Sequence, residues 1–401
     1  MTGASRYRLI ATLYCSQFLA LGFFYYTLAA VLRRDGVGLA WIGLLQFLGL
    51  FQVIRFLWAP LVDRYGWARL GHYRGWLVLL HLLMVVAVVI LGPLDVVADL
   101  PLVLTAVTAI ALLSATQDIA ADATAVRLLA PAERGVGNGI QMAGSYGGFV
   151  VGGNVALVVY DRAGWAAALT LVALLTAMPL PLLLRYREPP TPSRSSVLSR
   201  RSGGFFRQPG AALWAFVVMP VYYLGIASAY PLITPILVDA GWSLERIGAV
   251  LVLGGGTAVI LGALAGGVVL ATAGRCRALV LFGLVQVVAA SGLQLLTQPQ
   301  PGPVLVLAEV ALLHLAYGLT GTVIFALSMD WTRPTSPGTD YSLQACFAQL
   351  CSHGAGAVAL AVAELVGYSV TAALSASLGL VGTAAAWLFG RRWRATLAGT
   401  R

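Results

Sequence analysis

The chain has 401 residues, of which 59% are apolar and only 10% are charged, and its mean hydropathy is +0.87. A soluble domain of this size needs far more charge to cover its surface, so the composition excludes a soluble protein and indicates a polytopic membrane protein. The formal net charge of +10 comes entirely from arginine, because the chain contains no lysine. An arginine excess of this kind is typical of cytoplasmic loops, so we infer no nucleic-acid partner from it.

The apolar residues form continuous runs and do not alternate, which favours membrane-spanning helices over a β-barrel. A span needs about 20 apolar residues, and hydropathy together with helix breakers divides the chain into twelve such segments. The sequence therefore predicts an all-α polytopic membrane protein with twelve transmembrane helices. We place them near residues 9–32, 39–62, 74–92, 101–127, 138–160, 164–185, 211–238, 243–270, 277–297, 303–330, 340–366 and 369–390.

A stretch rich in proline, serine and arginine separates the sixth segment from the seventh and is typical of a linker. It predicts an N-terminal six-helix bundle at 1–185, a cytoplasmic linker at 186–210 and a C-terminal six-helix bundle at 211–401. With the N-terminus in the cytoplasm, 20 of the 25 arginines lie on that side, four on the other and Arg55 in a span. Both termini are therefore predicted to be cytoplasmic. The first apolar run is too long for a signal-peptide core, so we expect an uncleaved first span.

The two halves of the sequence resemble each other at two places. Residues 39–43 and 244–248 share a leucine, an isoleucine and a glycine at the same positions, at an offset of 205 residues. Gly135 precedes Gln141 by six residues, and Gly338 precedes Gln344 by six, at an offset of 203. These similar offsets indicate a duplicated six-span unit and thus two pseudo-symmetric six-helix bundles.

The second-to-third loop, residues 55–69, reads RFLWAPLVDRYGWAR. It resembles the major facilitator signature GxxxDRxGRR, with Asp63, Arg64 and Gly66 matching, whereas Ala59 replaces the first glycine. The resemblance implies the major facilitator fold and a loop that acts as a cytoplasmic latch between the halves. A carboxylate there can cap a helix N-terminus and pair with an arginine, and these bonds break when the halves rock. The alternative is a solvated loop whose charges only set the topology.

Arg55 lies within the second predicted span, and Asp118 and Asp122 lie within the fourth, all in the cytoplasmic halves of their helices. Four-residue spacing places the two carboxylates on one helix face. Because an unpaired charge in the membrane is expensive, we expect an ion pair between Arg55 and an aspartate. This pair is either part of a coupling or gating network or a permanent structural contact, and the sequence leaves both open. The coupling or gating candidates are Arg55, Asp63, Arg64, Asp118, Asp122, Arg127 and Asp330.

Aromatic and hydrogen-bonding side chains in the spans could enclose a solute. A histidine among them can also carry a proton during a transport cycle, but no ligand cluster predicts a metal site. The alternative for some of these side chains is aromatic packing at the membrane interface. The candidates for a substrate cavity are Gln17, Tyr25, Tyr26, Gln141, Tyr222, Tyr223, Tyr230, His314, Tyr317, Gln344 and His353.

Glycines recur every fourth residue in two spans, at Gly144, Gly148 and Gly152 in the fifth and at Gly262 and Gly266 in the eighth. This spacing predicts close packing of each helix against a neighbour. The major facilitator resemblance implies that these two helices pack against each other.

Residues 117–141 look like the corresponding segment of siderophore permeases, typified by the rhizobactin and pyochelin importers, and residues 55–64 and 336–344 match the same group. More distantly, these segments resemble muropeptide permeases and acetyl-coenzyme A transporters. The resemblance implies a monomeric inner-membrane transporter that imports a small, aromatic, pyochelin-like ferric siderophore by alternating access and proton symport. A muropeptide permease of cell-wall recycling and a major facilitator exporter remain as alternatives.

Chemistry beyond transport finds little support in the sequence. No GxxxxGK[ST] segment occurs, which excludes ATP hydrolysis by this chain as the drive. The buried histidines lack the companions of a catalytic set, so we predict neither an enzyme nor a cofactor.

Overall fold

The computed structural model describes residues 3–67, 69–189 and 202–392, so the middle of the predicted linker at 186–210 lies outside the described residues. Within the described part, ten helical stretches are long and apolar enough to cross a membrane. One of them, Pro131–Arg185, contains the fifth and sixth predicted spans, which Gly164 separates with a φ of 82°. The second predicted span consists of shorter helices between Leu39 and Arg64. All twelve predicted spans are therefore helical, and the all-α fold is confirmed.

Residue contacts divide the chain into two compact units. Unit 1 comprises Met1–Leu128, Gly144–Arg200 and Arg333–Cys346, and unit 2 comprises Leu129–Ala143, Arg201–Thr332 and Phe347–Arg401. The partition cuts two helices, α8 (Arg134–Val150) and α19 (Pro337–Val366), so that each contributes its first turns to one unit and its remainder to the other. The predicted bundles at 1–185 and 211–401 follow chain order instead, and that division stays a prediction.

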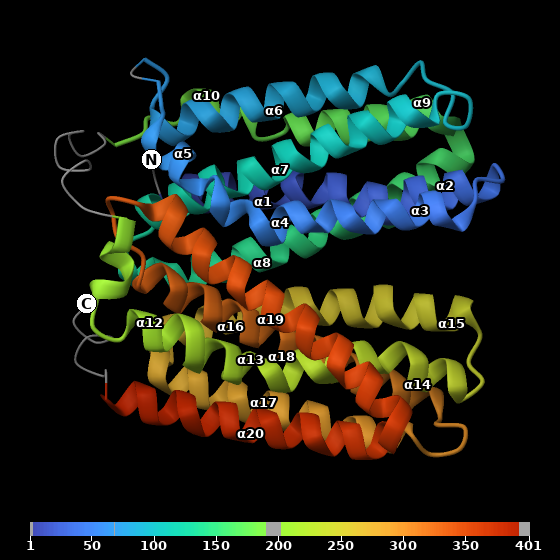
Figure 1. Cartoon of the computed structure of the whole chain (residues 1–401), viewed down its shortest axis with the longest axis vertical. Helices are drawn as coiled ribbons and strands as arrows, with labels where there is room; N and C mark the ends of the chain where they lie inside the picture. The colour runs from blue at the N-terminus through green and yellow to red at the C-terminus, as the bar shows by residue number, and fades with distance from the viewer. Residues whose placement is uncertain (1–2, 68, 190–201, 393–401) are drawn as a thin grey trace. The chain divides into compact units, whose positions relative to one another are not determined.

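Unit 1 is built on long helices that share an apolar core. In Figure 1, α6 (His72–Ile90), α7 (Leu100–Leu128) and α9 (Ala156–Ala177) run side by side, and α6 packs on both of the others. Buried Phe23, Val107 and Val172 belong to the same core cluster. The other elements are α1 (Gly3–Gly22), η1 (Phe23–Leu28), α2 (Ala29–Arg34), α3 (Leu39–Leu44), η2 (Leu45–Gly49), α4 (Leu50–Ile54), η3 (Arg55–Leu57), α5 (Ala59–Arg64), η5 (Val151–Val155) and α10 (Leu180–Arg185).

Unit 2 contains pairs of long helices in close contact. Figure 1 shows α17 (Arg275–Leu296) beside α20 (Tyr368–Arg392), while α16 (Thr257–Ala273) packs on α18 (Pro303–Asp330) and α13 (Met219–Ala229) packs on α20. Gly274, with a φ of 81°, provides the sharp turn between α16 and α17. The shorter elements are η4 (Pro131–Glu133), η6 (Ser202–Arg207), α12 (Ala211–Leu213), η7 (Trp214–Val218), η8 (Tyr230–Leu232), α14 (Ile233–Asp239), α15 (Leu244–Ala249) and η9 (Val250–Gly256).

The glycine ladder of the fifth span packs against α1. A Cβ at Gly144, Gly148 or Gly152 would press on the backbone of α1, so only glycine permits this approach. The expectation that these three glycines pack on the eighth span is wrong, because a small-residue ladder predicts closeness without specifying the partner.

The contact with the eighth span lies earlier in α8. Gly135 and Gly139 meet Gly267 and Ala263 of α16 within unit 2, where an added Cβ would again touch backbone atoms. The predicted ladder of the eighth span faces another helix: Gly262 and Gly266 both pack on α18. The fifth and eighth spans therefore do meet, but through different glycines from those expected.

Candidate functional site

Arg55, in η3, forms the centre of a buried charge cluster in unit 1. Its guanidinium lies 2.5 Å from an oxygen of Asp118 and 3.2 Å from an oxygen of Asp122, both on α7. It also donates to the side-chain oxygen of Gln52 at 2.7 Å. The side chains of all three ion-pair members are at most 6% exposed. The predicted Arg55–aspartate ion pair is confirmed, and it involves both carboxylates.

Tyr14 of α1 completes this cluster. Its hydroxyl donates to the second oxygen of Asp122 at 2.5 Å, so α1 and α7 are joined through one carboxyl group. The cluster contains two acids and a single base. It can therefore hold one proton without leaving a net buried charge, which is the chemistry that a proton-coupled step requires. Sequence reasoning missed Tyr14, because a tyrosine in an apolar span gives no signal until its partner is known.

His81 of α6 is a second buried polar group that sequence reasoning missed. Its Nδ1 faces the carbonyl of Leu77 at 2.7 Å, and its Nε2 lies 3.2 Å from Ser16 Oγ and 3.3 Å from Gln117 Nε2. Because a carbonyl only accepts, Nδ1 must carry the hydrogen and Nε2 accepts. A neutral imidazole is thus hydrogen-bonded to Gln117, the residue that precedes Asp118 on α7. The cost of a polar group in a span was the signal that could have identified it.

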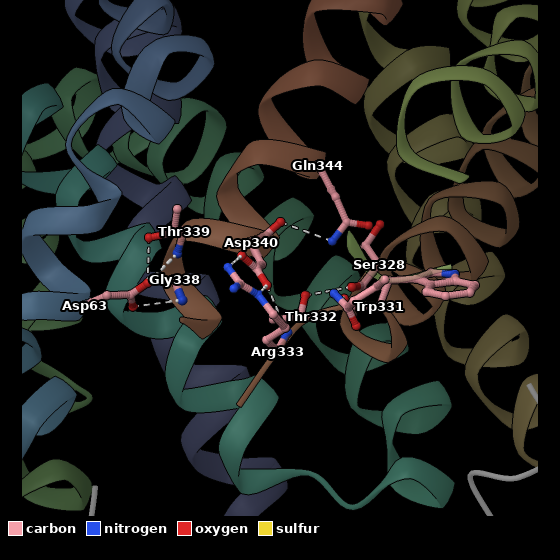
Figure 2. Close-up of polar contacts among 10 residues, drawn as sticks. Asp63, Ser328, Trp331, Thr332, Arg333, Gly338, Thr339, Asp340 and Gln344 are labelled. Carbon is pink, nitrogen blue, oxygen red and sulfur yellow. Dashed lines mark hydrogen bonds and ion pairs between the residues drawn. The ribbon is translucent and has the colours of Figure 1, made fainter. Parts of the chain in front are cut away.

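Asp63, near the end of α5, caps the first turn of α19 within unit 1. Its carboxylate accepts the backbone N–H groups of Gly338 at 3.0 Å and Thr339 at 2.7 Å, and the hydroxyls of Thr339 at 2.6 Å and Tyr73 at 2.7 Å. Figure 2 shows Asp63 reaching this turn from a neighbouring helix. The positive end of the helix dipole favours a carboxylate there. The expectation that Asp63 caps a helix N-terminus is confirmed.

Burial raises the pKa of the Asp63 carboxyl above its ordinary value, and the hydrogen bonds from Thr339, Tyr73 and Gly338 act in the opposite direction. A second carboxylate in the same turn of α19, Asp340, binds Arg333 through two N–H···O contacts of 2.7 Å each. These bonds raise the pKa of Arg333. The first turn of α19 is therefore held by Asp63, which accepts from its backbone, and by Arg333, which binds its Asp340 (Figure 2).

Asp330, the last residue of α18, holds the first turn of α8 within unit 2. It lies 2.8 Å from Arg134 and 2.9 Å from Arg275, and Arg275 donates to both carboxylate oxygens, one of which also accepts from Arg134. Arg275 also donates to the carbonyl of Pro131 at 2.6 Å. The carboxylate is 3% exposed and the arginines 14% and 13%. Asp330 thus joins the start of α8, the end of α18 and the start of α17.

The two remaining gating candidates lie in different surroundings. Arg127, at the end of α7, pairs with Glu188 at 2.6 Å, and the other oxygen of Glu188 accepts the backbone N–H of Arg74 at 3.0 Å. Arg64 is exposed and lies over the ring of Tyr65 at 5.5 Å. Arg127 is therefore part of a fixed contact between helix ends, whereas Arg64 points to the surface.

Four of the cavity candidates form one aromatic cluster in unit 2. The ring of Tyr230 lies 4.9 Å from that of Tyr317 and 4.8 Å from the imidazole of His314, and Tyr223 lies 6.0 Å from Tyr317. His314 Nδ1 faces the carbonyl of Val310 at 2.8 Å. Since that carbonyl accepts, Nε2 of His314 is left as an acceptor beside the tyrosines.

The other candidates are dispersed. Tyr25 and Tyr26 lie against Phe149, with ring centroids 6.4 and 5.4 Å apart. Tyr222 is fully buried and donates to the carbonyl of Leu279 at 2.8 Å, which fixes α13 on α17. Gln344 donates to the carbonyl of Asp340 at 3.1 Å.

Gln17 and Gln141 are buried, whereas His353 is exposed. Among the described residues, no group of three or more histidine, cysteine, aspartate or glutamate side chains could hold a metal ion.

Comparison with known proteins identifies the family. Residues 9–352 match the Major Facilitator Superfamily. The anhydromuropeptide permease of Escherichia coli (strain K12) is 30% identical to the chain over 353 residues, which cover 86% of this chain and 71% of that protein. An uncharacterized Haemophilus influenzae protein is 28% identical over 332 residues, 79% of this chain and 78% of its own. The chain therefore belongs to the Major Facilitator Superfamily, and it is a multi-pass membrane transporter and not an enzyme.

Solved structures share the fold at much lower sequence identity. The Escherichia coli fucose:proton symporter matches 96% of this chain and 98% of its own with a TM-score of 0.71 and 14% identity. The match to the human organic anion transporter covers 96% of this chain and 100% of that one, with a TM-score of 0.70 and 14% identity. The match to the proton:xylose symporter covers 98% of this chain and 96% of that one, with a TM-score of 0.68 and 13% identity. At these identities the likeness establishes the fold alone.

Proposed function

We propose that the protein is a permease of the bacterial inner membrane that imports anhydromuropeptides, which are sugar–peptide fragments, by alternating access with proton symport. The observation that carries the proposal is the 30% identity, across 86% of the chain, to an anhydromuropeptide permease. This substrate is one of the alternatives that the motif resemblance left open, and it replaces the siderophore as the first candidate. Both termini face the cytoplasm in this proposal, in keeping with the distribution of the arginines.

The aromatic cluster of unit 2 is suited to the sugar part of such a substrate. Tyrosine combines an apolar ring face with a hydroxyl that can donate or accept. Tyr223, Tyr230 and Tyr317 supply three such groups, and His314 adds an acceptor nitrogen. A sugar ring needs both features, because its C–H faces are apolar and its edges carry hydroxyls. We therefore assign this cluster to substrate binding.

The charge cluster of unit 1 is suited to coupling. Arg55 stays charged, so proton uptake by Asp118 or Asp122 changes the net charge of a cluster that is almost fully buried. The hydrogen bond from Tyr14 to Asp122 and the ion pairs of Arg55 would then rearrange between α1, η3 and α7. The Asp63 contact with α19 joins residues 275 positions apart and would open and close in the same cycle.

Ferric siderophore import is the second candidate. The tyrosines of unit 2 could equally pack on a phenolate ligand, and three sequence segments resemble siderophore permeases. A single uptake experiment separates the two substrates.

Full-length protein in proteoliposomes is supplied with a radiolabelled anhydromuropeptide or with radioactive iron bound to a small phenolate siderophore. Each substrate is tested with and without an acidic exterior. We expect gradient-dependent accumulation of the muropeptide and no accumulation of iron. Accumulation of iron alone would overturn the first candidate in favour of the second, and uptake of neither substrate would reject both.

Replacing either cluster aspartate tests the coupling role. Asp118→Asn and Asp122→Asn should lower gradient-driven uptake about tenfold, equivalent to about 1.4 kcal/mol, while the protein still folds and inserts. Asp161→Asn, at an exposed position of α9, is the matched control and should transport normally. Normal uptake by both cluster variants at normal expression would contradict a coupling role and leave Arg55 with a structural ion pair.

A further inference from the structure

Glu309 of α18 is a buried acid that plays no part in the sites above. The residue is 5% exposed, and its Oε1 accepts no hydrogen bond from any described residue. The carboxyl group lies in the notch left by Gly292 on α17, where an added Cβ would stand 2.6 Å from the Glu309 carboxyl carbon and 2.9 Å from Oε1. Helices α17 and α18 are thus packed around a carboxyl group.

The elements packed on α18 provide no cation for this carboxyl. They are α13, α16, α17 and η9, together with η8 at His314 and α8 at the end of α18. Neither α16 nor η9 contains a titratable side chain, and Arg134 of α8 is paired with Asp330, at the opposite end of α18 from Glu309. In α17, Arg275, Cys276 and Arg277 lie in the first turn, about 25 Å along the helix from Gly292. Arg275 is moreover paired with Asp330, at the opposite end of α18.

The titratable neighbours on α13 and α18 are also engaged elsewhere. Tyr222 donates to the carbonyl of Leu279, and Tyr223 lies beside Tyr317. His314 faces Val310 and the ring of Tyr230. Among the described residues, no side chain donates a hydrogen bond to Glu309 Oε1, and these neighbours have partners of their own.

A carboxylate without a cation or donors is strongly disfavoured in a membrane span, whereas the neutral acid can be buried at modest cost. Glu309 also lies six residues after Pro303, about 9 Å along the helix from the start of α18. In the proposed orientation this start faces the periplasm, so a proton can reach the carboxyl from the side with the proton supply.

We propose that Glu309 is a protonated acid at rest and the proton-exchanging site of unit 2, separate from the Arg55 cluster of unit 1. The periplasmic side and the link to transport rest on the proposed function, whereas protonation of the resting acid does not. When the packing of α17 on α18 loosens, water can enter the Gly292 notch and accept the proton. Return of the acid to the notch then requires that a proton bind again.

Infrared spectroscopy of the full-length protein in lipid membranes tests the resting state without any substrate. The wild type should show the carbonyl stretching band of a protonated carboxylic acid near neutral pH. Glu309→Gln should lose that band, while Glu364→Gln, which changes the exposed glutamate of α19, should retain it. An unchanged band in a folded Glu309→Gln protein would overturn the proposal.

Gly292→Ala provides a second variant that keeps the acid but fills its notch. The displaced carboxyl should give a shifted or missing band in the same membranes, and a band identical to wild type would count against the notch as the proton site. Asp118→Asn should leave the Glu309 band in place, because the two sites lie in different units.

Transport then tests the coupling. In proteoliposomes that accumulate the muropeptide, Glu309→Gln should abolish stimulation by an acidic exterior but retain exchange of labelled for unlabelled substrate. Full stimulation in this variant would remove Glu309 from the coupling mechanism. If the wild type fails to accumulate muropeptide, the proposed function fails, while the infrared result still decides whether Glu309 is protonated.

Discussion

Asp63 in unit 1 and Asp330 in unit 2 each hold the first turn of a helix from the other half of the sequence. Asp63 holds α19, and Asp330 holds α8. Asp63 binds the start of α19 through backbone N–H groups and hydroxyls, all of them neutral donors. Asp330 binds the start of α8 through Arg134 and also pairs with Arg275, which reaches both carboxylate oxygens, so its ion-pair partners are charged donors. The two contacts occupy comparable places in the two halves, but their chemistry is different.

This difference indicates which contact can open during transport. Water can replace neutral donors at a carboxylate with little net change in free energy, because each hydrogen bond contributes only about 1 kcal/mol net. Separating an acid from two partly buried arginines leaves uncompensated charges and costs several kcal/mol. We therefore expect the Asp63 contact to be exchangeable, and the Asp330 contact to be permanent.

Asp330→Ala should have the largest effect on stability. It leaves Arg134 and Arg275 without their carboxylate in a site where both are less than 15% exposed. The loss should be about 3–5 kcal/mol, as for other broken buried ion pairs, and should lower the melting temperature of the purified protein in detergent. Glu245→Gln, at an exposed position of α15, is the control and should melt like the wild type. A melting temperature close to wild type for Asp330→Ala would mean that the contact of Asp330 with the two arginines is not permanent.

Asp63→Ala should destabilise the protein less and alter transport more. The variant removes the cap of α19 and leaves the donors of Gly338 and Thr339 to find water, at a cost of about 2 kcal/mol. An exchangeable latch predicts a small fall in melting temperature together with a clear change in uptake rate. If Asp63→Ala melts as early as Asp330→Ala, the two contacts are equally structural and the contrast fails.

Thr339→Val isolates one bond of the latch. It keeps the shape and the backbone N–H but removes the hydroxyl that donates to Asp63 at 2.6 Å. The expected loss is about 1 kcal/mol, measured by thermal or chemical unfolding, and Thr339→Ser should restore most of it. Equal losses in the valine and serine variants would show that the methyl group matters as much as the hydroxyl, and the latch would then not depend on this hydrogen bond in particular.

The sequence predicted those contacts in which a single residue, by itself, would be too costly to bury without a partner. A charge inside a span must find a partner, so Arg55 and its aspartates could be paired in advance, and a carboxylate in the signature loop could be expected to cap a helix. The sequence does not indicate neutral partners such as Tyr14 and Thr339, because these side chains can be placed in or beside apolar spans without a carboxylate. The partner of each glycine ladder was equally hidden, since Gly148 fits against any helix that approaches closely.

The pH dependence of stability should differ between wild type and Asp63→Asn, with the smallest effect of the series. Burial raises the pKa of Asp63 in the folded protein, so the folded state binds its proton more tightly than the unfolded chain does. The stabilisation from this group is therefore complete below the unfolded pKa and is lost as the pH rises through the folded pKa. Melting temperatures measured from acidic to neutral pH should fall more for the wild type than for Asp63→Asn, which cannot titrate there. Parallel curves would show that the hydrogen bonds to Asp63 offset burial and leave its pKa equal in the folded and unfolded states, in which case the latch opens without a change of protonation.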